Sequence, residues 1–270
     1  MPHRSYLFVP GDRPERFDKA VTSGAHVTII DLEDAVLPER KAQAEAALRA
    51  WLERTQHRVV VRINSVGTPW YEQDCEVLGL PAVAGVMVPK AEDATQLSSL
   101  AQSLRGGQVL LPLIETVAGH FAAAQIARVP GVTRLAFGSF DFMSDAGIRG
   151  DAEELDAVRT HLVLVSRHAG IAAPVDGVTL ATDDVPQVER DVARSRRYGM
   201  GGKLCIHPRQ VPAVNTGFAP SAQEVDWAHR VAAALAQGSL GAVAVDGKLV
   251  DRPIELMARA ILADATGTDV

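Results

Sequence analysis

Short apolar runs rich in β-branched residues recur at fairly even spacing along the chain. Within each run the apolar positions are nearly continuous, whereas a strand with one face in water would alternate apolar and polar positions. This pattern is typical of parallel strands that are buried on both faces. We therefore predict eight such strands, at residues 5–9, 27–31, 58–63, 84–89, 109–114, 134–138, 173–178 and 203–206.

Most of the segments between these runs have helical patterns. They predict helices over residues 38–54, 92–104, 116–128, 152–168, 183–198 and 222–237. Strands that alternate with helices in a chain of 270 residues favour an α/β fold, a (β/α)8 TIM barrel. A doubly wound open sheet is the competing layout, but the number of strands and the missing dinucleotide-binding glycine fingerprint weigh against it.

The end of the chain has a different pattern. In residues 241–250 the pair Asp246-Gly247 separates two short apolar runs, which predicts a β-hairpin with a two-residue turn. A helical pattern follows at residues 254–263. We therefore expect a TIM-barrel domain at residues 1–238 and a C-terminal hairpin-plus-helix segment at residues 239–270, which serves as a lid or a subunit contact.

Composition and charge exclude several classes of protein. Apolar residues make up 47% of the chain, and the net charge of −6 comes without a block of like charge, so we expect no nucleic-acid surface. The longest uncharged run, residues 231–245, is too short to span a membrane. Only Cys75 and Cys205 carry thiols, neither in a CxxC pair, and we find no signal-peptide pattern, which favours a cytoplasmic protein.

Two carboxylates follow predicted strands in a similar way. The run 110–114 leads directly into Glu115, and the run 135–137 leads through Gly138 to Asp141. Active sites of TIM barrels lie at the carboxyl ends of the strands. Two oxygen ligands there suit a hard cation such as Mg²⁺. The alternative for either acid is a helix cap, because acidic residues are favoured in first helical turns.

Arg62 lies in an otherwise apolar strand and needs a partner, because a charge is rarely buried unpaired. Its planar fork matches a carboxylate. One interpretation is a clamp for the carboxylate of a substrate beside the metal. The other is a salt bridge to Glu33 or Asp34, after the neighbouring strand.

Basic residues also follow the first predicted strand. Arg13 lies in the loop after it, and Arg16 and Lys19 share one face of the helix that comes next. Together they could bind the phosphates of a large ligand, although each alone fits a solvated helix face. His207 has no HxH or HExxH companion, so a zinc site is not expected.

Several motifs occur in order over nearly the whole chain: RSYLFVPGDRPERFDKA, DLEDAV, VVVRIN, VMVPKAE, LLPLIET, LAFGSFDF, CIHPRQV and DGKLVDRP. With them the sequence resembles the citrate lyase β-subunit-like branch of the HpcH/HpaI aldolase family, the CoA ester lyases. The resemblance implies a (β/α)8 barrel, a Mg²⁺-dependent carbon–carbon lyase and a homo-oligomer, often a trimer.

The resemblance also implies roles for particular residues. The metal-binding glutamate and aspartate fall on Glu115 and Asp141, and the arginine that holds the oxo acid falls on Arg62. An acid that a mobile C-terminal segment delivers to a neighbouring subunit falls on Asp251, where a helix N-cap is the alternative. The chain departs from the family at Phe140, where a glutamate often precedes the aspartate, and this leaves the acyl group open.

These observations predict an enzyme that cleaves or forms a 3-hydroxyacyl-CoA of the citryl-, malyl- or citramalyl-CoA type. The products of cleavage are a short acyl-CoA and a 2-oxo acid. Two alternatives remain: a CoA-free aldolase for small hydroxy-keto acids, and a lyase subunit that acts on an acyl-carrier-protein thioester. A barrel that binds ligands without catalysis is less consistent with Glu115, Asp141 and Arg62 together.

Overall fold

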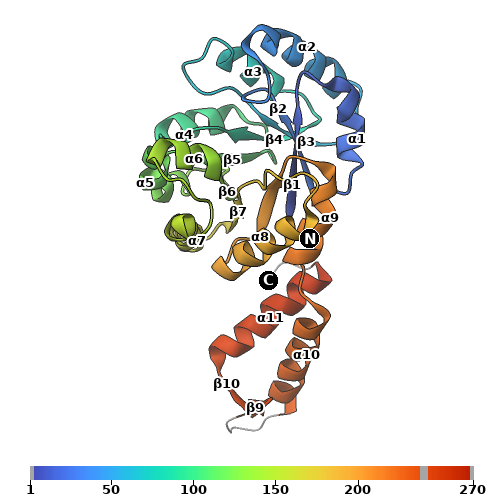
Figure 1. Cartoon of the computed structure of the whole chain (residues 1–270), viewed down its shortest axis with the longest axis vertical. Coiled ribbons are helices and arrows are strands. Elements are labelled where there is room, and N and C mark those ends of the chain that lie inside the picture. The colour runs from blue at the N-terminus through green and yellow to red at the C-terminus, as the bar shows by residue number, and fades with distance from the viewer. Residues whose placement is uncertain (1–2, 238–242, 268–270) are drawn as a thin grey trace. The chain divides into compact units, whose positions relative to one another are not determined.

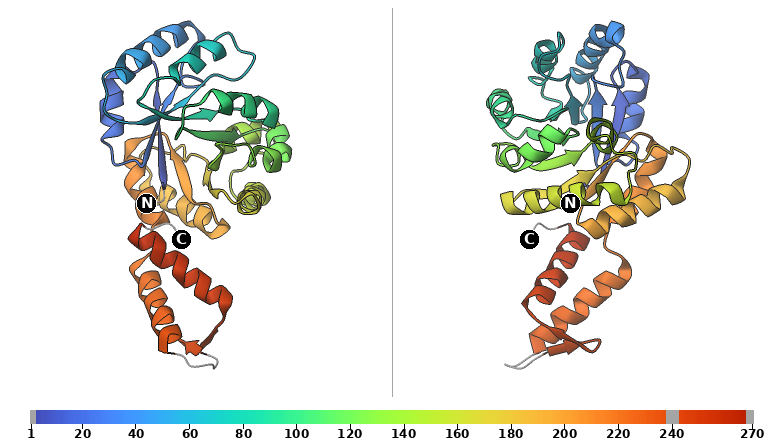
Figure 2. Two further views of the ribbon diagram at one scale, coloured as in Figure 1. Left: turned by 180° about the vertical axis from the view of Figure 1, so that it is seen from behind. Right: turned by 60° about the vertical axis from the view of Figure 1, so that its left-hand side comes forward.

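The predicted barrel is confirmed in a computed structural model that describes residues 3–237 and 243–267. Parallel strands close in the order β1 to β8, and β8 pairs with β1 (Figure 1). Helices surround the strands in each view (Figure 2). The strands are β1 (Ser5–Pro10), β2 (Val27–Asp31), β3 (Val59–Arg62), β4 (Val83–Val88), β5 (Val109–Ile114), β6 (Arg134–Phe137), β7 (Ala172–Asp176) and β8 (Gly202–Cys205).

The strand bounds follow the apolar runs closely. β2 and β5 have the predicted bounds, and the others differ by one or two residues at an end. Every residue of β3, β6 and β8 is buried, as expected for strands enclosed by side chains inside and helices outside. Inside the barrel a cluster of buried side chains fills the space, as in other TIM barrels: Tyr6, Ile29, Val60, Met87, Leu111, Leu113, Ala136, Val175 and Leu204.

The helices agree with the predicted segments except for several short ones. The first turns at Pro38–Arg40 and Glu153–Leu155 are 3₁₀ helices. Three further short helices, α3, α6 and α9, have no counterpart among the predicted segments because they span only about two turns. The α-helices of this part are α1 (Phe17–Val21), α2 (Lys41–Leu52), α3 (Tyr71–Val77), α4 (Ala94–Ser103), α5 (Val117–Ile126), α6 (Ser139–Ala146), α7 (Asp156–Ala169), α8 (Val185–Tyr198) and α9 (Val211–Phe218).

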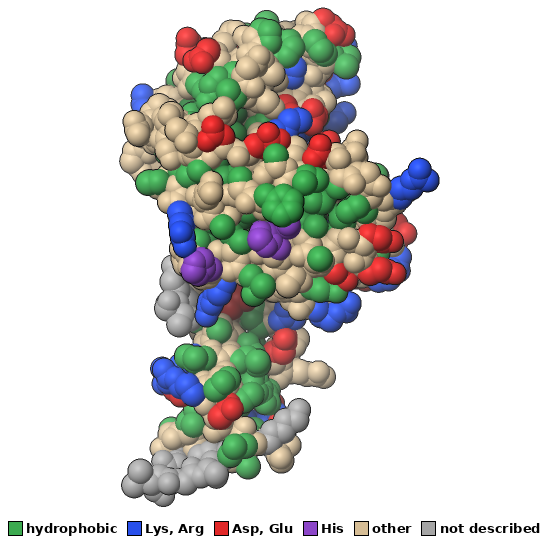
Figure 3. Space-filling view, turned by 90° about the vertical axis from the view of Figure 1, so that its left-hand side faces the viewer, with side chains coloured by type: hydrophobic (Ala, Val, Ile, Leu, Met, Phe, Trp, Pro, Cys, Tyr) green, Lys and Arg blue, Asp and Glu red, His purple; other side chains and the backbone are tan. Residues whose placement is uncertain are grey.

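One outer face of the barrel carries exposed apolar side chains. Phe121 on α5 is 79% exposed and Leu164 on α7 is 63% exposed. The rings of His120 and His161 lie between these helices with their centroids 4.3 Å apart. Hydrophobic and histidine side chains lie side by side on the face shown in Figure 3.

The chain divides into two compact units, His3–Asn215 and a second that begins at Thr216. The second unit contains α10 (Ala222–Gln237), β9 (Val243–Val245), β10 (Lys248–Val250) and α11 (Arg252–Thr266). Its core includes the buried Ala228, Val231 and Ala258. The predicted boundary between residues 238 and 239 lies outside the described residues and stays a prediction.

The C-terminal hairpin forms around the predicted turn. β9 and β10 are antiparallel, with Val245 opposite Lys248. Asp246 and Gly247 between them have φ values of 52° and 76°, as a type I′ turn requires. Residues 241 and 242 of the predicted hairpin lie outside the described part.

None of the helices in residues 3–237 and 243–267 combines the length and apolar character that a membrane crossing requires.

Candidate active site

Glu115 follows β5 directly and is only 1% exposed. Its Oε1 accepts a hydrogen bond of 2.8 Å from the backbone N–H of Lys90, whereas its buried Oε2 has no hydrogen-bond partner. The glutamate lies against Gly138, where an added Cβ would come within 2.5 Å of Glu115 Cβ. Glycine after β6 therefore makes room for this carboxylate.

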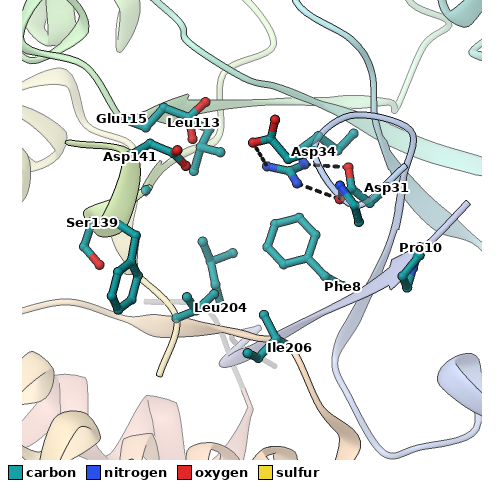
Figure 4. Close-up of a pocket in the computed structure, with 15 residues that line it drawn as sticks. Phe8, Pro10, Asp31, Asp34, Leu113, Glu115, Ser139, Asp141, Leu204 and Ile206 are labelled. Carbon is teal, nitrogen blue, oxygen red and sulfur yellow. Dashed lines mark hydrogen bonds and ion pairs between the residues drawn. The ribbon is translucent and has the colours of Figure 1, made fainter. Parts of the chain in front are cut away.

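Asp141 reaches the same cavity from the first turn of α6, where it is exposed. We expected both acids at strand exits, but β6 ends at Phe137 and Asp141 belongs to the helix that follows. Figure 4 shows Glu115 and Asp141 side by side at one end of the cavity. The structure therefore brings the two predicted metal ligands together.

The electrostatics of Glu115 indicate a site that favours a cation. Burial, together with the negative charges of Glu33 and Asp141, raises the pKa of Glu115 to about 8, against the opposing effects of the Lys90 N–H and Arg62. An unpartnered carboxylate oxygen beside a second carboxylate is a donor set that fits Mg²⁺. Among the described residues no three His, Cys, Asp or Glu side chains form a metal cluster. A Mg²⁺ ion held by two carboxylates keeps positions for water or substrate.

Arg62 ends β3 with only 8% of its surface exposed. Its Nε and Nη2 donate to the two carboxylate oxygens of Asp31 at 2.7 and 2.6 Å. Nη1 lies 3.1 Å from Glu33 Oε2 and 4.0 Å from Asp34 Oδ2. The guanidinium also lies over the ring of Phe8, 4.8 Å from its centroid. Arg62 therefore forms the salt bridge that the second interpretation predicted. It also lines the same cavity as the predicted metal ligands Glu115 and Asp141.

The acids around Arg62 keep its guanidinium group protonated. Burial alone would lower the pKa of the guanidinium, but Asp31, Glu33 and Glu115 raise it. Burial raises the pKa of Glu33, against the opposing effects of Arg62 and Lys90. Arg62 therefore carries a permanent positive charge next to a group of carboxylates.

The cavity between these groups has a volume of about 300 Å³ and two chemically different ends. The charged end carries Glu115, Asp141 and Arg62. Toward the opposite side Figure 4 shows Phe8, Leu204 and Ile206. Phe140 and Val178 add to this apolar part. Such a cavity can bind a small carboxylic acid at one end and accept an apolar or uncharged chain at the other.

Asp31 is a site residue that the sequence interpretation missed, because it named only Glu33 and Asp34 as partners for Arg62. A signal was available: Asp31 ends β2 directly opposite Arg62 in the parallel pairing of β2 and β3. Neighbouring strand ends in a barrel point their side chains to the same face. The aspartate was therefore the best-placed partner.

Lys41 was also missed, because the sequence placed it only within the helix predicted over residues 38–54 and indicated no contact for its side chain. The residue is only 8% exposed, and its Nζ donates to the carbonyl oxygens of Leu32 and Glu33, both at 2.9 Å. It also donates to Asn64 Oδ1 at 2.6 Å. Lys41 therefore fixes the backbone of the loop that carries Glu33.

The basic residues after β1 lie at a second cavity. Arg16 and Lys19 line this cavity of about 540 Å³ together with His207 and Arg209, whereas Arg13 is not among its lining residues. The two cavities share walls at Phe8, Pro10 and Ile206. His207 caps a short helix, where its Nδ1 accepts from Arg209 N.

Asp251 belongs to the C-terminal unit, where it is the N-cap of α11. Its Oδ1 accepts a hydrogen bond of 3.1 Å from the backbone N–H of Ile254. Asp251 therefore has the N-cap role that the sequence analysis gave as the alternative. A role in catalysis stays a prediction.

Comparisons with known proteins extend over nearly the whole chain. A family model described as HpcH/HpaI aldolase/citrate lyase matches residues 4–208. The citrate lyase subunit beta-like protein of Deinococcus radiodurans is 37% identical over 278 residues, which cover 96% of both chains. The (3S)-malyl-CoA thioesterase of Cereibacter sphaeroides is 33% identical over 273 residues, which cover 98% of this chain and 95% of the relative.

A solved structure has the same architecture. CitE from Mycobacterium tuberculosis, in complex with magnesium, acetoacetate and coenzyme A, matches with a TM-score of 0.84 and 33% sequence identity. The match covers 98% of each chain. The similarity therefore includes the barrel and the C-terminal unit.

Proposed function

Because the chain belongs to the HpcH/HpaI aldolase/citrate lyase family, we propose that it is a Mg²⁺-dependent carbon–carbon lyase acting on CoA thioesters. Its substrate would be a 3-hydroxyacyl-CoA of the citryl-, malyl- or citramalyl-CoA type, and its products an acyl-CoA and a 2-oxo acid. The observation that carries the proposal is the shared cavity of Glu115, Asp141 and Arg62.

Each residue at the charged end has a role in this proposal. Glu115 and Asp141 would hold Mg²⁺, which when bound supplies a Lewis acid for the keto oxygen and the carboxylate of the oxo acid. Arg62, whose Nε and Nη2 are fixed by Asp31, would donate its other N–H groups to the same carboxylate. Because Arg62 is held before substrate arrives, little reorganisation is needed in the reaction.

In cleavage, the 3-hydroxyl group loses its proton and the bond between C2 and C3 breaks. The electron pair goes to C2, which gives the thioester enolate, and C3 becomes the carbonyl carbon next to the carboxylate of the 2-oxo acid. Protonation of the enolate at C2 yields the acyl-CoA. In the reverse direction Asp251 would accept the proton from C2 of the acyl-CoA, delivered to the site of a neighbouring subunit in a homo-oligomer, such as a trimer.

The second cavity supports CoA as the carrier of the acyl group. Arg16 and Lys19 line it, as the sequence led us to expect for a phosphate site, and Arg209 adds a third permanent cation. This cavity adjoins the catalytic cavity at Phe8, Pro10 and Ile206, so a thioester whose phosphates lie in it would have to reach the catalytic cavity past these residues. Arg13 would contact the ligand from the loop before α1. The free Cys75 and Cys205 are consistent with a cytoplasmic enzyme.

The proposal is tested by Glu115→Ala and Asp141→Ala. With Mg²⁺ and a panel of citryl-, malyl-, citramalyl- and longer CoA thioesters, we expect wild-type protein to release a 2-oxo acid. Each variant should lose at least about 100-fold in kcat/KM, since a metal ligand that stabilises the transition state contributes several kcal/mol. Undiminished Mg²⁺-dependent cleavage in both variants would overturn the proposal.

The same assay separates the alternatives. Free CoA should compete with a CoA thioester, but not with the substrate of a CoA-free aldolase. A carrier-protein thioester that is cleaved while its CoA analogue is not would identify a lyase subunit. Release of free CoA without an acyl-CoA product would instead indicate thioester hydrolysis, the activity named for the relative from Cereibacter sphaeroides.

A further inference from the structure

Lys90 stands out through its backbone conformation. It follows β4 with φ at 45°, and Asp246 in the hairpin turn is the other non-glycine residue in the described ranges with a positive φ. This left-handed conformation is costly for a residue with a side chain and persists where surrounding contacts hold it. Lys90 is held in this way, since its N–H bonds Glu115 and its Nζ bonds Glu33.

Glu33 lies between the two cations of the site. Its Oε1 accepts from Lys90 Nζ at 2.6 Å, while its Oε2 lies 3.1 Å from Arg62 Nη1 without forming a hydrogen bond. The glutamate is 5% exposed, and its Oε1 also accepts a hydrogen bond of 3.5 Å from the Ser65 hydroxyl. Its carboxylate therefore has one close hydrogen-bonded cation, Lys90, and one cation, Arg62, that it approaches without such a bond.

Few N–H donors of Arg62 remain for a substrate. A guanidinium has five N–H groups, and Asp31 takes one on Nε and one on Nη2. Three remain for other partners, two of them on Nη1, the atom that Glu33 approaches. A Glu33 carboxylate that turned fully onto Nη1 would occupy donors that the oxo acid needs.

We propose that Lys90 is a positioning residue that holds the Glu33 carboxylate back from Arg62, so that Arg62 keeps free N–H donors for the carboxylate of a 2-oxo acid. The inference rests on the proposed function, which supplies the oxo acid. Without the ammonium group, Glu33 would have Arg62 as its nearest cation and would compete with the substrate for it.

The matched pair Arg49–Glu45 on α2 shows what a purely structural pair looks like here. Arg49 and Glu45 have side-chain exposures of 34% and 7%, against 42% and 7% for Lys90 and Glu33. Neither Arg49 nor Glu45 lines the catalytic cavity. Arg49→Met therefore removes a half-exposed cation from a buried carboxylate outside the site.

The experiment measures the binding of pyruvate, a 2-oxo acid, by calorimetry at saturating Mg²⁺. We expect Lys90→Met to weaken binding about tenfold, the loss that one charge-assisted hydrogen bond produces. Lys90→Arg should bind like wild type, and so should Arg49→Met. The Mg²⁺ affinity of Lys90→Met should be equal or higher, because a positive charge near Glu115 is gone, whereas general damage would lower it.

The decisive comparison is a double-mutant cycle with Glu33→Gln. If Lys90 acts through the charge of Glu33, Lys90→Met in the Glu33→Gln background should change pyruvate affinity less than about threefold. A full tenfold loss in that background, or pyruvate binding by Lys90→Met equal to wild type, would overturn the role of Lys90. Failure of wild-type protein to bind any of the 2-oxo acids that citryl-, malyl- and citramalyl-CoA release would overturn the proposed function itself, and this inference with it.

Discussion

At the scale of single residues, the site gathers more negative than positive charge. Arg62 and Lys90 face the carboxylates of Asp31, Glu33, Asp34, Glu115 and Asp141. An excess of acids in a partly buried cavity is unfavourable unless a cation or a proton compensates. In the absence of metal Glu115 takes the proton, because burial and the neighbouring acids raise its pKa to about 8.

This charge predicts how the metal-free protein responds to pH. The pKa of Glu115 is about 4.5 in the unfolded chain and about 8 in the folded protein. Between these values the folded protein holds a proton that the unfolded chain has released, so the free energy of unfolding falls as pH rises. The stabilising effect is complete below about pH 4.5 and lost above about pH 8.

The measurement is the difference in Tm between wild type and Glu115→Gln in EDTA, from about pH 5 to about pH 8. The variant has no titrating group at this position, so wild type should lose stability relative to it across that window. Mg²⁺ should reverse the trend for wild type only, since the metal needs the ionised carboxylate. A constant difference in EDTA would contradict the raised pKa.

At the scale of elements, the turn from β6 into α6 builds one wall of the site. β6 ends at Phe137, and after Gly138 the helix begins at once, so that Phe140 and Asp141 lie in its first turn. Asp141 lines the catalytic cavity, whereas Phe140 and Val178 line both this cavity and an adjoining one of about 350 Å³. Phe140 therefore separates two spaces.

Removal of the Phe140 side chain should join the two cavities. We expect Phe140→Ala to shift the ratio of kcat/KM for a longer acyl-CoA over a shorter one by roughly tenfold, because each methylene that gains an apolar contact contributes about 0.8 kcal/mol. Competing thioesters in one reaction give the ratio directly. Phe121→Ala, which removes an exposed ring from α5, is the control and should leave it unchanged. An unchanged ratio in Phe140→Ala would show that Phe140 does not limit the acyl chain.

At the scale of the whole molecule, the question is how the C-terminal unit contributes to catalysis. Asp251 caps α11 in this unit, and the hairpin before it turns at Asp246-Gly247. A capping aspartate can be replaced by asparagine with little loss of stability, because asparagine also accepts the backbone hydrogen bond. The structural role of Asp251 and its proposed role in catalysis can therefore be separated.

Hybrid oligomers test the proposed delivery of Asp251 to a neighbouring subunit. Asp251→Asn and Glu115→Gln should each be nearly inactive alone, with the Tm of Asp251→Asn close to that of wild type. When the two are coexpressed, random assembly should give about one quarter of sites with both intact groups, and activity should return accordingly. A hybrid no more active than its parents would argue against a shared site.

Much of the fold was accessible from the sequence because the signals are local. Continuous apolar runs and helical periodicity depend on near neighbours, so the strands β2 and β5 were predicted with their bounds. Short helices such as α6 were not predicted, because two turns give little helical periodicity. The approximate position of Glu115 also followed from the sequence, because a residue at the end of a barrel strand faces the functional end of the barrel.

The sequence by itself determined the alternation of strands and helices, the polar strand ends and the candidate acids Glu115 and Asp141. Only the tertiary structure decided which charges meet. Asp31 and Arg62 are 31 positions apart, and Glu33 and Lys90 are 57 apart, yet each pair is in hydrogen-bond contact. The reason is that pairing and desolvation depend on elements that closure of the barrel brings together, and local patterns carry no measure of either.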